Sequence, residues 1–319
     1  MVHLDDDTLL ALLDLPSVTT CVDDAFRAWG SGQAATTQRV RATVENGAES
    51  GMASAMAAVV PPFCGGKVYA TKDGVFSFIN VLFDIDGRLL CTLDGDALTR
   101  LRTPAASALA IRHLAADGVE VAALVGAGRQ AWYHLEMLRD ELPTLASVRV
   151  HARRPEAAAA LVHRAQEAGI PAFLAPTAAA AVDGAEVVVT ATPATAPLFP
   201  ASVVGDRALL CAVGSTKAGR CEIGPEVIER CVAVVADDVV GSMSECGDLI
   251  QAARQGRFDW VRAIELNAVV AGRVAVTRAG NGPVLFETQG VALQDVAAAG
   301  LGWRRHQEQH ARHEQEEHA

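Results

Sequence analysis

Residues 121–131, VAALVGAGRQA, place two glycines between an apolar, strand-like run and a segment with helical character. Gly126 allows a tight turn, Gly128 allows close approach to a pyrophosphate, and Ala131 is the third small residue of the pattern. The helix that follows would direct its positive end at that charge. A further strand ends ~20–25 residues later, the spacing of a Rossmann unit. The pattern therefore predicts a dinucleotide site rather than a glycine turn without a ligand.

The end of that next strand carries two adjacent arginines. In SVRVHARRPE, residues 147–156, Ala152 stands where an acid would bind the 2′-hydroxyl of NAD, and Arg153 and Arg154 follow it. A guanidinium is always charged and suits the additional 2′-phosphate of NADP. The stretch therefore predicts that NADP(H) is preferred over NAD(H). The alternative is a solvated arginine pair at the start of a helix.

The remaining chain shows two kinds of pattern. From residue 119 onward, short continuous apolar runs alternate with helix-length segments, which is typical of a parallel sheet covered on both faces. Residues 36–95 contain strand-like runs that indicate a mostly antiparallel sheet, and residues 5–30 are helical in character. We therefore predict an α/β protein with a Rossmann domain and a second, α+β domain.

Two local signals refine this outline. Asp86 and Gly87 lie between two alternating runs and predict a tight hairpin. We also predict a helix that spans the domain boundary. It would have Thr103 as its N-cap, Pro104 at its first position and Gly118 at its end.

Composition excludes several classes of function. The net charge of −11 argues against nucleic acid as a partner, because phosphate binding needs a basic face. No apolar run is long enough to cross a bilayer, and the first residues, MVHLDDDTLL, lack the pattern of a signal peptide. The seven cysteines contain no Cys-x-x-Cys pair, so we expect reduced thiols in a cytoplasmic protein.

Nearly the whole chain resembles the ornithine cyclodeaminase/mu-crystallin family of NAD(P)-dependent oxidoreductases. The motifs that carry the resemblance are QRVRATV, GGKVY, LDGDALTRLRTPAASALA, VGAGRQA, TATPATAPLF, VGSTKAGRCEI, ECGDLI and VLFETQGVALQD. The resemblance implies a homodimer whose substrate-binding and dimerisation domain comprises residues 1–112 and 292–319, with a Rossmann domain at 113–291. It also implies a small substrate with an amino-acid-like carboxylate beside an amine or imine.

In the family, three cations hold that carboxylate, and they correspond to Arg41, Lys67 and Arg102. Arg39 competes with Arg41, because we expect only one of the two to face the pocket. Arg102 would precede the Thr103 N-cap, where the positive end of a helix favours an anion. Without the resemblance, Lys67 and Arg41 would be taken as exposed surface charges.

The resemblance and the fold together place cofactor-binding residues at the carboxyl ends of several strands. Besides the two arginines above, these residues are Gly126, Ala127, Gly128, Arg129, Gln130, Ala131, Thr190, Ala191, Thr192, Val213, Gly214 and Ser215. The chain departs from the family in two substrate-pocket positions: Thr216 replaces the aspartate of cyclodeaminases, and Ile79 replaces a threonine of many members.

The remaining titratable residues receive weaker assignments. We predict no metal site, because the helically spaced histidines lie in a charged tail, and we assign no catalytic step to the other groups. They are His306, His310 and His313 in the tail, and His113, Asp237, Asp238, Glu245 and Asp248 elsewhere.

These features favour an enzyme that uses NAD(P)H to reduce the C=N bond of an imine derived from an α-keto acid. Lys67 and Arg102 are the expected catalytic residues: both clamp the substrate, and Lys67 could donate the proton that the product nitrogen needs. Two alternatives stay open. One is a cyclodeaminase, a lyase with bound NAD that acts on ornithine or lysine, and the other is a binding protein that retains NADPH without turnover.

Overall fold

The computed structural model describes residues 1–47, 50–72, 75–278 and 281–317. The chain forms two compact units: the first comprises Met1–Arg102 and the chain from Val291 onward, and the second is the continuous segment Thr103–Gly290. The first division lies inside one long helix, α3 (Asp96–Leu114). Among the helices in the described part of the chain, none has the length and apolarity needed to cross a bilayer.

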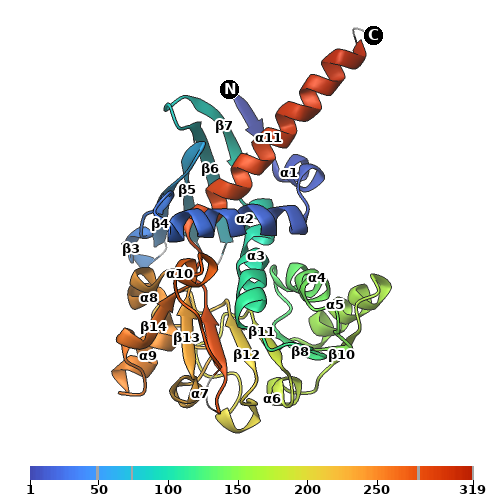
Figure 1. Cartoon of the computed structure of the whole chain (residues 1–319), viewed down its shortest axis with the longest axis vertical. Helices are drawn as coiled ribbons and strands as arrows, with labels where there is room; N and C mark the ends of the chain where they lie inside the picture. Colours follow the sequence, from blue (N-terminus) through green and yellow to red (C-terminus); the bar gives the residue numbers. More distant parts are fainter. Residues whose placement is uncertain (48–49, 73–74, 279–280, 318–319) are drawn as a thin grey trace. The chain divides into compact units, whose positions relative to one another are not determined.

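The second unit is built on an eight-stranded, fully parallel sheet (Figure 1). Its strand order is β10-β9-β8-β11-β12-β15-β13-β14. The strands are β8 (Val121–Val125), β9 (Ser147–His151), β10 (Ala172–Leu174), β11 (Val187–Thr190), β12 (Leu209–Ala212), β13 (Ala233–Ala236), β14 (Ala263–Glu265) and β15 (Val284–Glu287). The order reverses between β8 and β11, where doubly wound sheets bind their ligands.

Helices follow most of these strands. They are α4 (Ala131–Glu141), α5 (Pro155–Glu167), α6 (Ala178–Val182), α7 (Pro225–Arg230), α8 (Val239–Glu245), α9 (Gly247–Arg254) and α10 (Leu266–Val270), with 3-10 turns η2 (Ala201–Val203) and η3 (Trp260–Arg262). Strands β11, β12, β13 and β15 are buried along their whole length, as their continuous apolar runs predict. The predicted fold class is confirmed.

The first unit contains a seven-stranded sheet with the order β1-β7-β6-β5-β4-β2, and β3 also pairs with β4. Its strands are β1 (Val2–Leu4), β2 (Ala35–Thr36), β3 (Val40–Val44), β4 (Gly51–Val60), β5 (Phe63–Lys72), β6 (Val75–Asp84) and β7 (Leu89–Asp94). All pairs are antiparallel except β1 with β7. The predicted hairpin is confirmed: Gly87 has φ +87° in the turn between β6 and β7.

Helices α2 (Leu15–Gly30) and α11 (Ala292–Glu317) pack together, and α11 covers strands β4, β5 and β6 (Figure 1). The predicted helical segment 5–30 is two helices, because α1 (Asp6–Leu12) ends before Asp14. The Asp14 carboxylate accepts a hydrogen bond from the Ser17 backbone N–H and thereby starts α2.

The predicted start of the domain-crossing helix is wrong. Helix α3 begins at Asp96, so Thr103 is not an N-cap and Pro104 lies inside the helix. Leu98 and Leu101 are buried on this first part of the helix, and the Asp6 carboxylate accepts a hydrogen bond from the Ala97 N–H at 2.7 Å. Packing and capping in the first unit therefore outweigh the local preference of proline for a helix start.

Helix α11 approaches strand β5 closely at Gly300 and helix α1 at Gly302. A Cβ atom at Gly300 would lie 2.4 Å from the ring of Phe63 on β5, whereas one at Gly302 would lie 3.1 Å from the flexible tip of Leu9. We expect Gly300→Ala to lower the free energy of unfolding by about 1–3 kcal/mol in spite of the higher helix propensity of alanine. Gly302→Ala is the matched control and should change stability by well under about 1 kcal/mol, as measured by urea unfolding. Equal effects at both sites would contradict the close packing at Phe63.

Candidate active site

Lys67 is a buried cation in the first unit. It lies on β5 with only 1% of its surface exposed, on the sheet face that α11 covers. Its Nζ donates hydrogen bonds to Thr99 Oγ1 at 2.5 Å and to Asp295 Oδ1 at 3.2 Å, and lies 4.4 Å from the centre of the Phe78 ring. The preceding glycines permit this course of the strand, since a Cβ at Gly65 would come within 2.3 Å of a β6 carbonyl.

Arg102 joins the same cluster from α3. Its Nε donates to Asp295 Oδ1 at 3.2 Å and its Nη1 donates to Gln294 Oε1 at 2.9 Å. Helix α3 begins at Asp96, six residues before Arg102. Arg102 therefore does not lie at the positive end of a helix, where an anion was expected to be stabilised. Side chains of α11 hold Arg102 instead. Sequence reasoning missed Asp295, although an acid within the apolar run VALQDVAAAGL could have indicated a buried partner.

The charges in this cluster determine its titration. Burial, with smaller contributions from the charges of Arg102 and Arg39, lowers the pKa of Lys67 to about 8, although the Asp295 carboxylate acts in the opposite direction. Burial alone would raise the pKa of Asp295, but Lys67 and Arg102 hold it below its ordinary value. The cluster thus contains more positive than negative charge, and Lys67 titrates near physiological pH.

Arg39 and Arg41, which compete for one contact to the substrate carboxylate, lie on either side of Val40 and are both partly buried. Residues two apart along a strand share a face, and Val40 between them is 65% exposed while both arginines are half-buried. Arg41 is in register with Ser54 on β4. Arg39 is the one whose charge acts on Lys67 and Asp295, so the structure associates Arg39 with the cluster.

Ile79, which the sequence assigns to the substrate pocket, lies on the sheet face opposite Lys67. Ile79 pairs with Val68, and the two side chains are 42% and 51% exposed on the face opposite Lys67. Asn80 is the β6 residue in register with Lys67, and its side chain is buried. Neighbouring residues of a strand point to opposite faces, so Asn80 and Ile79 lie on different sides of the sheet.

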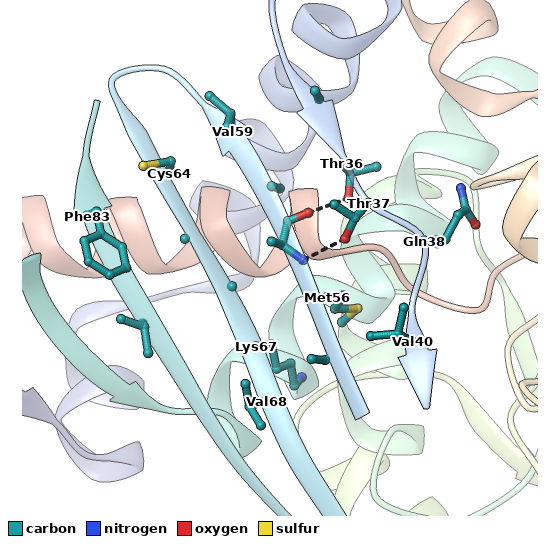
Figure 2. A pocket seen from close by; sticks show the side chains of 17 residues that line it. Thr36, Thr37, Gln38, Val40, Met56, Val59, Cys64, Lys67, Val68 and Phe83 are labelled. Atoms are coloured by element: carbon teal, nitrogen blue, oxygen red, sulfur yellow. Dashed lines mark hydrogen bonds between the residues drawn. The ribbon is translucent and has the colours of Figure 1, made fainter. Parts of the chain in front are cut away.

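The exposed face of the same sheet forms an apolar groove of about 820 Å³ (Figure 2). Its labelled lining residues are Thr36, Thr37, Gln38, Val40, Met56, Val59, Cys64, Lys67, Val68 and Phe83. Thr37 is held at its edge by two hydrogen bonds with the backbone of Ala57. The Lys67 ammonium points to α11 and not into the groove. None of these lining residues therefore presents a charged group to the groove.

In the second unit, the glycine-rich turn after β8 has the expected close contact. Gly126 has φ +127°, and a Cβ there would lie 2.5 Å from the carbonyl oxygen of Ala191, so only glycine fits. A Cβ at Gly128 would meet no atom within 4 Å, which leaves the backbone open to a ligand before α4 begins at Ala131. These features fit the pyrophosphate of a dinucleotide.

A buried glutamate ties the neighbouring loops together. Glu222 accepts hydrogen bonds from Thr190 Oγ1 at 2.9 Å, from Thr192 N and Oγ1 at 2.6 Å each, and from Gly214 N at 2.6 Å. A Cβ at Gly214 would lie 2.0 Å from the Thr192 carbonyl oxygen, so the loops after β11 and β12 touch. Gly126 also contacts Ala191. The predicted cofactor-binding segments 126–131, 190–192 and 213–215 therefore meet at one edge of the sheet.

Asp248 supports that glutamate from α9. Its carboxylate accepts hydrogen bonds from the backbone N–H groups of Glu222 at 2.7 Å and Ile223 at 3.2 Å, and its own N–H donates to Ser215 Oγ at 3.0 Å. Burial raises the pKa of Glu222 to about 7, against the hydrogen bonds from Thr192, and raises that of Asp248 to about 6. Sequence reasoning missed Glu222 and noted Asp248 without a role; acids in the apolar contexts RCEIG and CGDLI were the available signal.

The other predicted residues lie as follows. Arg153 and Arg154 are exposed between β9 and α5, and Thr216 is half-buried beside Gly214, whose carbonyl accepts its N–H.

His306 and His310 have ring centres 4.8 Å apart, while the side chain of His313 lies outside the described residues. No group of three potential metal ligands occurs among the described residues. Of the other groups, Asp237 accepts hydrogen bonds from the buried segment after β15, and His113 and Glu245 acquire no chemical role.

The sequence matches the model of the ornithine cyclodeaminase/mu-crystallin family over residues 7–309, which confirms the resemblance. The Delta(1)-pyrroline-2-carboxylate reductase 2 of Burkholderia ambifaria is 29% identical over 294 residues, 90% of each chain. The probable ornithine cyclodeaminase of Bordetella pertussis Tohama I has a TM-score of 0.89 and 36% identity, covering 97% of this chain and 98% of that one. An archaeal alanine dehydrogenase dimer with bound NAD has a TM-score of 0.90 and 25% identity over 97% of each chain.

The raised pKa of Glu222 predicts a pH dependence of stability. Between pH 4.5 and about 7 the folded state retains a proton that the unfolded state releases, so the contribution of Glu222 is largest below pH 4.5 and decreases as the pH rises to 7. Glu222→Gln does not titrate. Relative to this variant, the wild type should lose about 3 kcal/mol of unfolding free energy between pH 4.5 and 8.

Urea unfolding at several pH values measures this difference. Glu156→Gln, at an exposed position in the first turn of α5, is the control and should follow the wild type at every pH. Parallel pH profiles for the wild type and Glu222→Gln would contradict the prediction.

Proposed function

This chain belongs to the ornithine cyclodeaminase/mu-crystallin family, and we propose that it is an NAD(P)H-dependent oxidoreductase that reduces the C=N bond of an imine derived from an α-keto acid. The observation that carries the proposal is the buried cluster of Lys67 and Arg102, with Arg39 nearby and Asp295 as its carboxylate. Buried positive charge of this kind favours an anionic group on the substrate. The Burkholderia relative is named for an imine with such a carboxylate.

The two units have separate tasks in this proposal. The first unit binds the substrate carboxylate through Lys67 and Arg102, and the second binds the dinucleotide at the segments joined by Gly126 and Glu222. The cofactor, when bound, supplies the hydride that the imine carbon receives. The product nitrogen gains the proton of the Lys67 ammonium, whose pKa of about 8 suits proton donation near neutral pH. Arg41 could provide a further contact to the carboxylate.

The function is tested by NADPH oxidation with defined substrates. We expect turnover with pyrroline-2-carboxylate, piperideine-2-carboxylate, or pyruvate or glyoxylate mixed with amines. We expect no ammonia from ornithine or lysine with NAD, because a cyclodeaminase needs a base for the distal ammonium and the hydroxyl of Thr216 is not one. Stoichiometric ammonia and proline from ornithine would instead support the lyase, and NADPH binding without any turnover would support the binding protein.

Cofactor choice depends on the exposed arginines after β9. We propose that Arg153 and Arg154 bind the 2′-phosphate of NADP(H). Arg153→Ala or Arg154→Ala should raise KM for NADPH about ten- to a hundredfold and leave KM for NADH nearly unchanged. Ala152→Asp should shift the preference toward NADH, since a carboxylate binds the ribose hydroxyl and repels the phosphate. An NADPH/NADH ratio that none of these variants changes would contradict the assignment.

We also propose that the protein is a homodimer, with the apolar groove face covered by a second copy. Val40, Val68 and Ile79 are 65%, 51% and 42% exposed on this face, and exposed apolar patches of such extent mark interfaces. Val68→Glu should halve the mass measured by light scattering. Val261→Glu, at a residue that is 84% exposed in the other unit, is the control and should leave the mass unchanged. A monomeric wild type would contradict the proposal.

The seven cysteines are free thiols in the structure. Because reducing compartments keep thiols unpaired, we propose a cytoplasmic location.

A further inference from the structure

We infer that Asp295 is a positioning residue for this reaction, one that holds Lys67 and Arg102 at a fixed separation with a single carboxylate oxygen. The inference rests on the proposed function. Asp295 Oδ1 accepts from Lys67 Nζ and from Arg102 Nε, both at 3.2 Å, and only 1% of the residue is exposed. Two cations that converge on one oxygen cannot move independently of it.

The location of Asp295 on α11 makes this arrangement rigid. Gln294, the preceding residue, accepts a hydrogen bond from Arg102 Nη1, so two consecutive residues of α11 hold two nitrogens of one guanidinium. On the opposite side, Thr99 of α3 accepts a hydrogen bond from Lys67 Nζ and itself donates to the carbonyl of Gly95. The ammonium and the guanidinium are therefore oriented before any substrate binds, which lowers the entropic cost of binding a carboxylate.

The charge balance gives Asp295 a second effect. The charged groups that act on Lys67 are Asp295 from α11, Arg102 from α3 and Arg39 from the segment before β3. Asp295 is the negative member of this set, and burial and the two arginines all favour the neutral amine. Without the carboxylate, Lys67 loses its proton at a lower pH and is then neither a cation for the substrate nor a proton donor.

The two oxygens of the Asp295 carboxylate differ in their partners. Its second oxygen, Oδ2, is buried and accepts no hydrogen bond from the residues that the structure describes. A structural carboxylate in a protein interior would ordinarily have both oxygens satisfied. Oδ2 is therefore an acceptor that can bind an N–H donor of the substrate, whereas the two cations bind its carboxylate in the proposed function.

The test compares Asp295→Asn and Asp295→Glu with Asp14→Asn in full-length protein. Asp14 also joins α11 to its neighbours, through Arg305 at 2.9 Å, but lies outside the cluster. For Asp295→Asn we expect KM for pyrroline-2-carboxylate to rise about ten- to a hundredfold with KM for NADPH unchanged. The basic limb of the kcat/KM profile should shift to lower pH by about 1–2 units. Asp295→Glu should restore the pH profile while KM stays raised, and Asp14→Asn should match the wild type in both.

Unchanged pH profile and KM in Asp295→Asn, or the same changes in Asp14→Asn, would overturn the inference. If Asp295→Asn does not fold, the inference depends on Asp295→Glu: an unchanged substrate KM in that variant would overturn it. A wild type without imine reductase activity would contradict the proposed function instead. In that case the Lys67 titration, followed by NMR with labelled lysine and assigned with Lys67→Met, still tests whether Asp295 raises the pKa of Lys67.

Discussion

The hydrogen bonds that converge on Glu222 determine how the loops after β11 and β12 are arranged at one edge of the parallel sheet in the second unit. Parallel strands end at one edge, and the loops that follow carry backbone N–H groups that no strand satisfies. Glu222 accepts bonds from residues after β11 and β12, and Asp248 in turn fixes the backbone of Glu222. The buried carboxylate replaces the missing ladder partners, so loops from different parts of the chain behave as one surface.

The first unit uses buried charge in a different way. Lys67, Arg102 and Asp295 come from a strand and two helices, and their attraction is strong only because water is excluded. Replacing Asp295 leaves two buried cations without their carboxylate, so under the proposed function substrate binding and the stability of the unit would depend on the same contacts.

Much of the fold follows from patterns in the sequence. Local periodicity predicts the parallel sheet, and glycines between strand-like runs predict the Gly126 turn and the Asp86–Gly87 hairpin. These signals lie within a few neighbouring residues, so the sequence alone reveals them. The errors have a different origin. Pro104 lies inside a helix because contacts with distant residues outweigh its preference, and the face on which Ile79 lies depends on strand pairing that the local sequence does not reveal. Glu222 and Asp295 were missed because their partners are identified only once the chain is folded.

The long sequence separation within the Lys67–Asp295 pair has a consequence for biosynthesis. The two residues lie 228 positions apart, whereas the second unit is one uninterrupted segment that ends at Gly290. At the ~5–20 residues per second of ribosomal synthesis, roughly 10 to 50 seconds pass between translation of Lys67 and of Asp295. Throughout that interval the nascent first unit holds two cations that have no carboxylate to bury against. A chain truncated before α11 retains all strands of the second unit. It lacks Asp295, the carboxylate that pairs with Lys67 and Arg102 in the first unit.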